Sequence, residues 1–346
     1  MDQGRVNTRN VIRISAIIAG ILFITESLFR QRGDGSLLLT LLFWKSLVDG
    51  CIAFVAAAEL SKGKWILPVK NALLSFYPML FVLSVFFIFL LFQVDIYPWY
   101  SDGGVWFNKN FFGARNFIIL LILYVAGRKF AIESRREGNR KNFYAVIFLF
   151  FFVVSQSMVA FDWVMPLEYP WYSTLFGGYH FVESLYSGIA VAAILCFIIS
   201  RKAAGKNIQP VGRTLFDTAT MLFGFSLLWA GLFYSQYLVI WYGNLPEEIS
   251  FLVKRISLPY MRTLSYSILI ELFAVPFLIL LSRRVKSNPP LVFITALVVL
   301  TGIFTERLVY LLPAVSLDPL RLLIQFAGIG TISILIHKNK IINSSS

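Results

Sequence analysis

The chain consists of long apolar runs separated by short polar stretches. A bilayer core about 30 Å thick is crossed by roughly 20 apolar residues in a helix. Lipid offers no partner for unpaired backbone groups, so a spanning segment is a helix or part of a closed barrel, and these runs lack the alternation typical of barrel strands. The pattern therefore predicts an all-α polytopic membrane protein of about ten transmembrane helices in one integral membrane domain, residues 1–346. The expected spans are 11–29, 38–59, 72–94, 114–132, 142–162, 179–200, 214–241, 261–282, 290–312 and 319–337.

Composition and charge support this environment. Hydrophobic residues make up 58% of the chain and the mean hydropathy is +0.74, which exceeds what a water-exposed surface tolerates. The net charge of +13 does not indicate nucleic-acid binding, because Lys and Arg lie in short clusters between apolar runs and not along one face. Twenty of them fall in the loops on one side of the predicted spans and five on the other. By the positive-inside rule, an even number of spans then places both termini in the cytoplasm.

The sequence predicts no redox centre and no metal site on this chain. Cys51 and Cys196 lie inside apolar runs, so neither a disulfide framework nor an iron–sulfur cluster is expected. The only histidines are His180 and His337, the latter at the end of the last span, which does not suit a haem held between facing helices. There is no CxxCH, Walker, dinucleotide-binding or HExxH motif. MDQGRVNTRN leads directly into an apolar run without a cleavage signal, so we expect the first span to be retained.

Ionisable residues inside the spans are the first candidates for function, because each costs several kcal/mol unless it is paired or hydrated. Lys45 and Asp49 are four residues apart on one helix face and are expected to form an ion pair. Glu306 and Arg307 are adjacent, so they point about 100° apart and should have different partners. The candidates for a proton path are Asp217, Glu271, Glu306, Lys45 and Asp49. The alternative for each is a structural ion pair or an interhelical hydrogen bond.

A second group of polar residues lies at the outer ends of the fifth and sixth spans. His180 and Glu183 are three residues apart on one face, and Asp162 is on the other side of the loop that precedes them. A quinol site needs hydrogen-bond acceptors for each hydroxyl and an exit for protons, which these groups can provide. Asp162, His180 and Glu183 are therefore quinol-site candidates. The alternative is a role in structuring the interface.

The outer loops 95–113, 163–178 and 241–260 are rich in Trp, Tyr and Pro. Such loops form rigid structure at headgroup level, where a peripheral partner can dock. Residues 246–257 are expected to form a short amphipathic helix in the interface. An ordinary aromatic belt is the alternative for the single Trp and Tyr residues. The partner-docking candidates are Trp99, Trp171, Tyr172, Trp241, Glu247 and Glu248.

Three stretches together resemble one known family. They are FDWVMPLEYPWYSTLFGGYHF at 161–181, SQYLVIWYGNLPEE at 235–248 and VPFLILLSRRVKSNPPL at 275–291. In order, spacing and loop placement they are similar to the second polytopic quinol:cytochrome c oxidoreductase subunit of bacterial alternative complex III, the ActF subunit. That subunit is related to the NrfD and polysulfide-reductase (PsrC) membrane subunits.

The resemblance implies a ten-helix subunit of two four-helix bundles plus two further helices, in the bacterial cytoplasmic (inner) membrane. It implies menaquinol oxidation in the respiratory chain, with proton translocation as a further role. The implied partners are a homologous NrfD-like membrane subunit, a periplasmic iron–sulfur/molybdopterin-like subunit, and multihaem and monohaem cytochrome c subunits, which carry the haem and iron–sulfur clusters. Asp162 matches the Asp of the FDW motif, and Glu306 stands where the family commonly has Asp.

This chain departs from the family at three histidine positions. Residues 208–212 read IQPVG, and Leu272 and Ile303 occupy the other two places, so a proton path through imidazoles is not expected. One alternative function is the quinone-reactive anchor of a molybdopterin or iron–sulfur oxidoreductase. A secondary transporter, from a different class, is disfavoured because no span is broken near its centre by a Gly or Pro pair in matching halves.

Overall fold

The computed structural model describes residues 13–15, 17–22, 32–100, 104–202 and 209–344, and within these ranges every regular element is a helix. The predicted all-α membrane fold is therefore confirmed. Among the described residues, eight helices are long and apolar enough to cross a membrane by length and composition. They are Ser36–Leu60, Tyr77–Ile96, Lys141–Glu168, Leu175–Arg201, Gln209–Gly243, Pro259–Leu280, Pro289–Leu311 and Pro319–His337.

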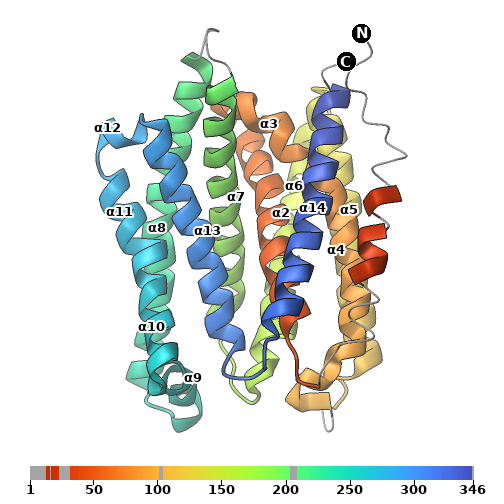
Figure 1. Ribbon diagram of the computed structural model, residues 1–346, viewed down its shortest axis with the longest axis vertical. Helices are drawn as coiled ribbons and strands as arrows, with labels where there is room; N and C mark the ends of the chain where they lie inside the picture. The colour runs from red at the N-terminus through yellow and green to blue at the C-terminus, as the bar shows by residue number, and fades with distance from the viewer. Residues whose placement is uncertain (1–12, 16, 23–31, 101–103, 203–208, 345–346) are drawn as a thin grey trace.

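The long helices alternate in direction along the bundle (Figure 1). Those of the first half are α2 (Ser36–Leu60), η1 (Lys64–Ile66), α3 (Leu67–Leu74), α4 (Tyr77–Leu90), η2 (Leu91–Ile96), η3 (Pro98–Tyr100), α5 (Lys109–Arg135), α6 (Lys141–Met158), η4 (Val159–Val164) and η5 (Met165–Glu168). Those of the second half are α7 (Leu175–Lys202), α8 (Gln209–Gly243), α9 (Pro246–Ser257), α10 (Pro259–Ile268), η6 (Leu269–Ala274), α11 (Val275–Leu280), α12 (Arg283–Lys286), α13 (Pro289–Leu311) and α14 (Pro319–Ser344).

The helices form two groups of four. In the first group α2, α4, α5 and α6 pack together, and in the second α7, α8 and α13 pack with the helix formed by α10, η6 and α11. The most extensive helix contact, between α2 and α7, joins the two groups, and α14 packs on the outside of α2 (Figure 1). The buried core therefore runs through both groups, centred on α2 and α7.

Three predicted spans need comment. The span 72–94 is not one helix, because α3 ends at Leu74 and α4 begins at Tyr77. Pro78 explains the break, since it has no N–H to donate and its ring clashes with the carbonyl of Leu74. The span 114–132 lies within α5, which packs between α4 and α6 but is not one of the eight apolar helices. The span 11–29 lies partly outside the described residues.

The contact between α2 and α7 depends on two glycines. A Cβ atom built on Gly50 would lie 1.7 Å from the backbone oxygen of Ser184, and one on Gly188 would lie 2.2 Å from the backbone carbon of Gly50. The two helix backbones therefore touch at this point. Small residues allow such close approach between helices in a membrane, where van der Waals packing replaces the hydrophobic effect as the driving force.

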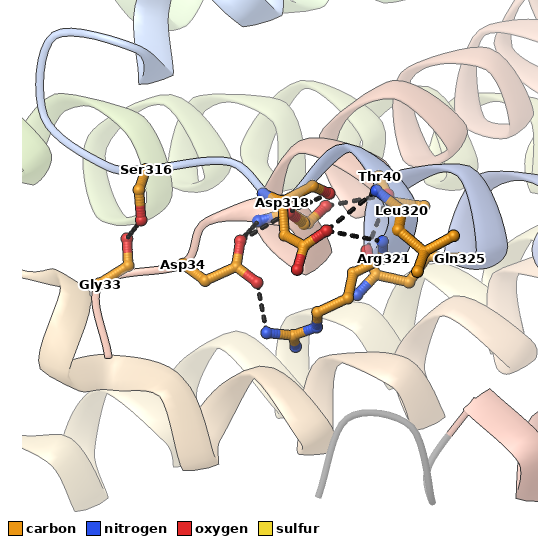
Figure 2. A network of polar contacts seen from close by, with 9 residues as sticks. Gly33, Asp34, Thr40, Ser316, Asp318, Leu320, Arg321 and Gln325 are labelled. Atoms are coloured by element: carbon orange, nitrogen blue, oxygen red, sulfur yellow. Dashed lines mark hydrogen bonds and ion pairs between the residues drawn. The ribbon is translucent and has the colours of Figure 1, made fainter. Parts of the chain in front are cut away.

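A polar network fixes the start of α14 to the start of α2 (Figure 2). The Asp34 carboxylate accepts hydrogen bonds from the backbone N–H of Ser36 at 2.9 Å and forms an ion pair with Arg321. Asp34 and Arg321 are 2% and 5% exposed. Backbone hydrogen bonds between Gly33, Gly35 and Ser316 add a short bridge alongside this pair. The network compensates for the mostly lipid-facing surface of α14, which leaves few apolar contacts to hold it.

Arg321→Met should loosen α14 by removing the partner of the buried Asp34 carboxylate. We expect a loss of about 1–3 kcal/mol of stability, because Asp34 keeps its bonds to Ser36. Thermal denaturation of the detergent-solubilised protein measures the effect. Arg321→Lys should retain part of the stability, and equal stability of the two variants and the parent would show that the pair does not anchor α14.

The end of the bundle opposite α9 carries the basic loops (Figure 1). There Lys70 lies 2.5 Å from both Glu59 and Glu137, and Lys141 lies 2.5 Å from Glu137. Hydrogen bonds from Lys141 and Lys70 hold the pKa of the Glu137 carboxyl at about 2, so it is ionised at neutral pH. This network ties the α5–α6 turn to the ends of α2 and α3.

Candidate functional site

The core of the second group contains a buried carboxyl group surrounded by hydrogen-bond donors. Oε1 of Glu306 on α13 accepts hydrogen bonds from the hydroxyl of Tyr179 on α7 at 2.7 Å, from Nε1 of Trp229 on α8 at 3.2 Å and from the hydroxyl of Tyr310 at 3.2 Å. Glu306 is 1% exposed. Three helices thus converge on one oxygen of this carboxyl group, which fixes its position in the bundle.

Arg307, the next residue on α13, points toward a different acid. Its Nη1 donates to Oε2 of Glu183 on α7 at 2.6 Å, and both side chains are 1% exposed or less. Nδ1 of His180, one turn earlier on α7, lies 3.7 Å from the same carboxylate oxygen. The prediction that Glu306 and Arg307 have different partners is confirmed, as is the shared face of His180 and Glu183.

The charges of this group do not balance unless it holds a proton. Glu183 and Glu306 are two buried acids on the packed helices α7 and α13, while Arg307 supplies one positive charge. A buried net charge is costly, and two close carboxyl groups avoid it by sharing one proton. A neutral group of these three residues therefore holds one proton on one of the two carboxyl groups.

A second buried ion pair is linked by hydrogen bonds to α7, the helix that also carries Glu183 of the Arg307–Glu183 pair. Lys45 and Asp49 on α2 form the ion pair predicted from their spacing, which is confirmed, and they are 2% and 0% exposed. Nε2 of Gln156 on α6 donates to Asp49 at 2.8 Å and to the Ser184 hydroxyl at 3.3 Å. Because Ser184 follows Glu183 directly, the two pairs meet across α7. We call Lys45, Asp49, Gln156, Tyr179, His180, Glu183, Ser184, Trp229, Glu306, Arg307 and Tyr310 the central cluster.

No family model and no curated protein matches this chain. The chemistry of the central cluster therefore has to be inferred from its own geometry. Its described side chains combine carboxyl, hydroxyl, imidazole and amide groups in the middle of the bundle. Groups of these kinds can exchange protons. Among the described residues, no three His, Cys, Asp or Glu side chains are grouped so that they could hold a metal ion.

Asp162 lies in a separate polar group in the first bundle. Both of its carboxylate oxygens bind Arg115 of α5, at 2.7 and 2.9 Å, and Asn116 donates to it at 2.7 Å. Nε1 of Trp163 in turn donates to Asn116 at 2.9 Å. The expected meeting of Asp162 with His180 is not found among the described contacts, because α5 supplies the partners of Asp162 instead.

Two of the acids lie in π-helical segments, which often occur at functional sites. Asp162 is in η4 and Glu271 is in η6. Glu271 is half-buried against α13, since a Cβ atom built on Gly302 of α13 would lie 2.9 Å from the Cβ atom of Glu271.

Asp217 is half-buried near the start of α8, twelve residues before Trp229. At the helical rise this is about 18 Å from the cluster, so Asp217 is not part of it.

The predicted docking residues divide into two sets. Trp99 and Trp171 are 3% and 5% exposed, and the ring of Trp171 stacks on Phe251 of α9 at 3.9 Å between centroids. Their assignment to a docking surface is therefore wrong, because both rings pack inside the chain. The side chains of Tyr172, Trp241 and Glu247 are exposed, while Glu248 is half-buried.

The predicted amphipathic helix at 246–257 is α9, at the lower end of the bundle in Figure 1. Its inner face holds Phe251 and Arg255, and its outer face exposes Val253 and Ile256. Arg255 pairs with Glu168 of η5 at 2.5 Å, which fixes α9 to the α6–α7 connection. The helix therefore closes one end of the second group.

Proposed function

We propose that this chain is a membrane subunit of a respiratory quinol-oxidising complex of the alternative complex III type. In that role it lies in the bacterial cytoplasmic membrane with both termini in the cytoplasm. It supports menaquinol oxidation, carries a proton through the central cluster and binds periplasmic redox subunits at the exposed Tyr172, Trp241 and Glu247. Haem and iron–sulfur centres belong to those partners.

The central cluster is the observation that carries the proposal. A structural ion pair needs one acid and one base, whereas here two buried acids, Glu183 and Glu306, accompany one base, Arg307. A proton on one of the acids would balance the charge of this group. Conducting such a proton is useful where quinol oxidation releases protons. The resemblance of 161–181, 235–248 and 275–291 to an ActF-type subunit supplies the link to quinol, because all three stretches flank the second group of helices.

The partners are tested by purification of the complex in mild detergent, followed by a haem stain and mass spectrometry of the co-purifying proteins. We expect a multihaem cytochrome c, an iron–sulfur protein and a second polytopic subunit. A stable haem-free monomer contradicts the proposal. Co-purification of a molybdopterin protein without cytochromes indicates the quinone-reactive anchor of a different oxidoreductase.

Glu306→Gln should lower quinol oxidation by the assembled complex on the order of 10²-fold, the lower range for loss of one general acid or base. The amide keeps the bonds from Tyr179 and Trp229 but cannot share a proton with Glu183. Turnover and proton release are measured together on complexes with the same subunit content. Glu133→Gln, on the half-buried face of α5, is the matched control and should leave both unchanged. Full turnover and full proton release in Glu306→Gln would remove the cluster from the mechanism.

A further inference from the structure

A cavity of about 490 Å³ lies between α8, α9, α10 and α13, at the end of the second group that α9 closes. Its size falls in the range of small-molecule sites. Among its lining residues Tyr237, Ile256 and Tyr266 are 42%, 45% and 57% exposed. They belong to helices of the membrane bundle, so the mouth of the cavity faces lipid.

The deep wall of the cavity is polar and belongs to the central cluster. Glu306, Tyr179 and Tyr310 line it, and all three are buried. The lining also includes Arg255, which is 6% exposed and whose Nε has no hydrogen-bond partner among the described residues. Oε2 of Glu306 likewise accepts no hydrogen bond from a described donor. Two residues of the lining thus hold one buried donor and one buried acceptor without a described partner.

The charge of this wall suits a neutral ligand. Arg255 is the only basic residue in the lining, and its charge is balanced by Glu168 at 2.5 Å. Its guanidinium also lies 3.5 Å from the centre of the Phe251 ring. A phosphate group would find no unpaired cation there and would face the Glu306 carboxyl group. A neutral ring that donates and accepts hydrogen bonds avoids both costs.

The remaining walls are aromatic and aliphatic. Phe233 of α8, Phe251 of α9 and Leu269 of η6 belong to this part of the lining. A planar ring packs well against aromatic side chains, and an apolar tail can leave between Tyr237 and Tyr266 into the bilayer. We propose that this cavity binds the hydroxylated ring of a quinol, with one hydroxyl at Glu306 and its tail in lipid.

This site differs from the one expected at Asp162. The two oxygens of Asp162 are already bound by Arg115 and Asn116, whereas Glu306 lines the cavity. The inference concerns binding only, and it involves no bond made or broken. It rests on the proposed function, because quinol is the lipid-soluble hydrogen-bonding ring which that function supplies.

Photolabelling with an azido-menaquinone tests the site in the detergent-purified complex. Labels are expected on α8, α9 or α10 residues that line the cavity, mapped by mass spectrometry. Leu269→Trp should raise the half-saturating concentration on the order of tenfold or more, because the indole fills the space for the ring. Leu278→Trp is the matched control, since Leu278 is 66% exposed on α11 and does not line the cavity.

The following outcomes overturn the proposal. Labels near Asp162, labels on another subunit, or undiminished labelling of Leu269→Trp each place quinol elsewhere. A co-purified phospholipid that the menaquinone cannot displace makes the cavity a lipid site. Subunit composition is determined in a separate measurement. If cytochromes co-purify but no label is found in the cavity, only the quinol site in the cavity is refuted. If the cavity is labelled but no cytochromes co-purify, only the proposed type of complex is refuted.

Discussion

Arg307→Met should destabilise the protein by about 3–5 kcal/mol, the cost of removing one partner of a buried ion pair. Arg307 and Glu183 are 1% and 0% exposed, and the guanidinium is the only basic group that the structure shows bonded to Glu183. Without it, Glu183 and Glu306 must both be neutral or leave a buried charge. Chemical or thermal denaturation of the detergent-solubilised protein measures the loss.

Glu183→Gln combined with Arg307→Met separates the lost charge balance from lost packing. The double variant has no unpaired charge at this position, so it should recover most of the stability, because replacing both members of a buried pair is often nearly neutral. Arg213→Met, at an exposed position near the start of α8, is the control for a change of Arg to Met alone. A double variant as unstable as the single one would show that Arg307 acts by packing and not by charge.

The parts of the site that the sequence predicted are those set by spacing within one helix. Lys45 and Asp49 are one turn apart, so their pairing follows from helix geometry alone. The different directions of Glu306 and Arg307 follow in the same way, from the angle between adjacent residues. Long apolar runs likewise predicted the helices themselves, since lipid leaves few other structures.

Contacts between distant helices could not be predicted from the sequence. Tyr179 and Glu306 are 127 positions apart, and nothing in their local sequence indicates that their helices adjoin. Arg115, the partner of Asp162, lies 47 positions before it, and nothing in the local sequence indicates that the two side chains meet. Trp99 and Trp171 were misassigned because an aromatic residue in a loop has the same sequence pattern whether its ring packs inward or faces headgroups.

Gly188→Ala should be among the most disruptive single-methyl changes in the chain. The added Cβ would lie 2.2 Å from the backbone carbon of Gly50, and backbone atoms cannot move aside as a side chain can. The α2–α7 contact joins the two groups of helices, so forcing these helices apart weakens the whole bundle. We expect a loss of about 3 kcal/mol, the upper end of the usual cost of overpacking. The yield of monodisperse protein and its denaturation midpoint measure it.

Gly231→Ala on α8 is the matched control, because no atom outside its own helix lies within 4 Å of the added Cβ. There alanine should be neutral or slightly stabilising, since it restricts the unfolded chain and favours a helix. The same Gly→Ala substitution is thus expected to lower the stability of the protein at Gly188 and to leave it unchanged or raise it slightly at Gly231. Gly50→Ala should reproduce the Gly188→Ala loss, because its Cβ meets the backbone oxygen of Ser184 on the same facing helix. Equal stability of all three variants would mean that α2 and α7 do not approach this closely.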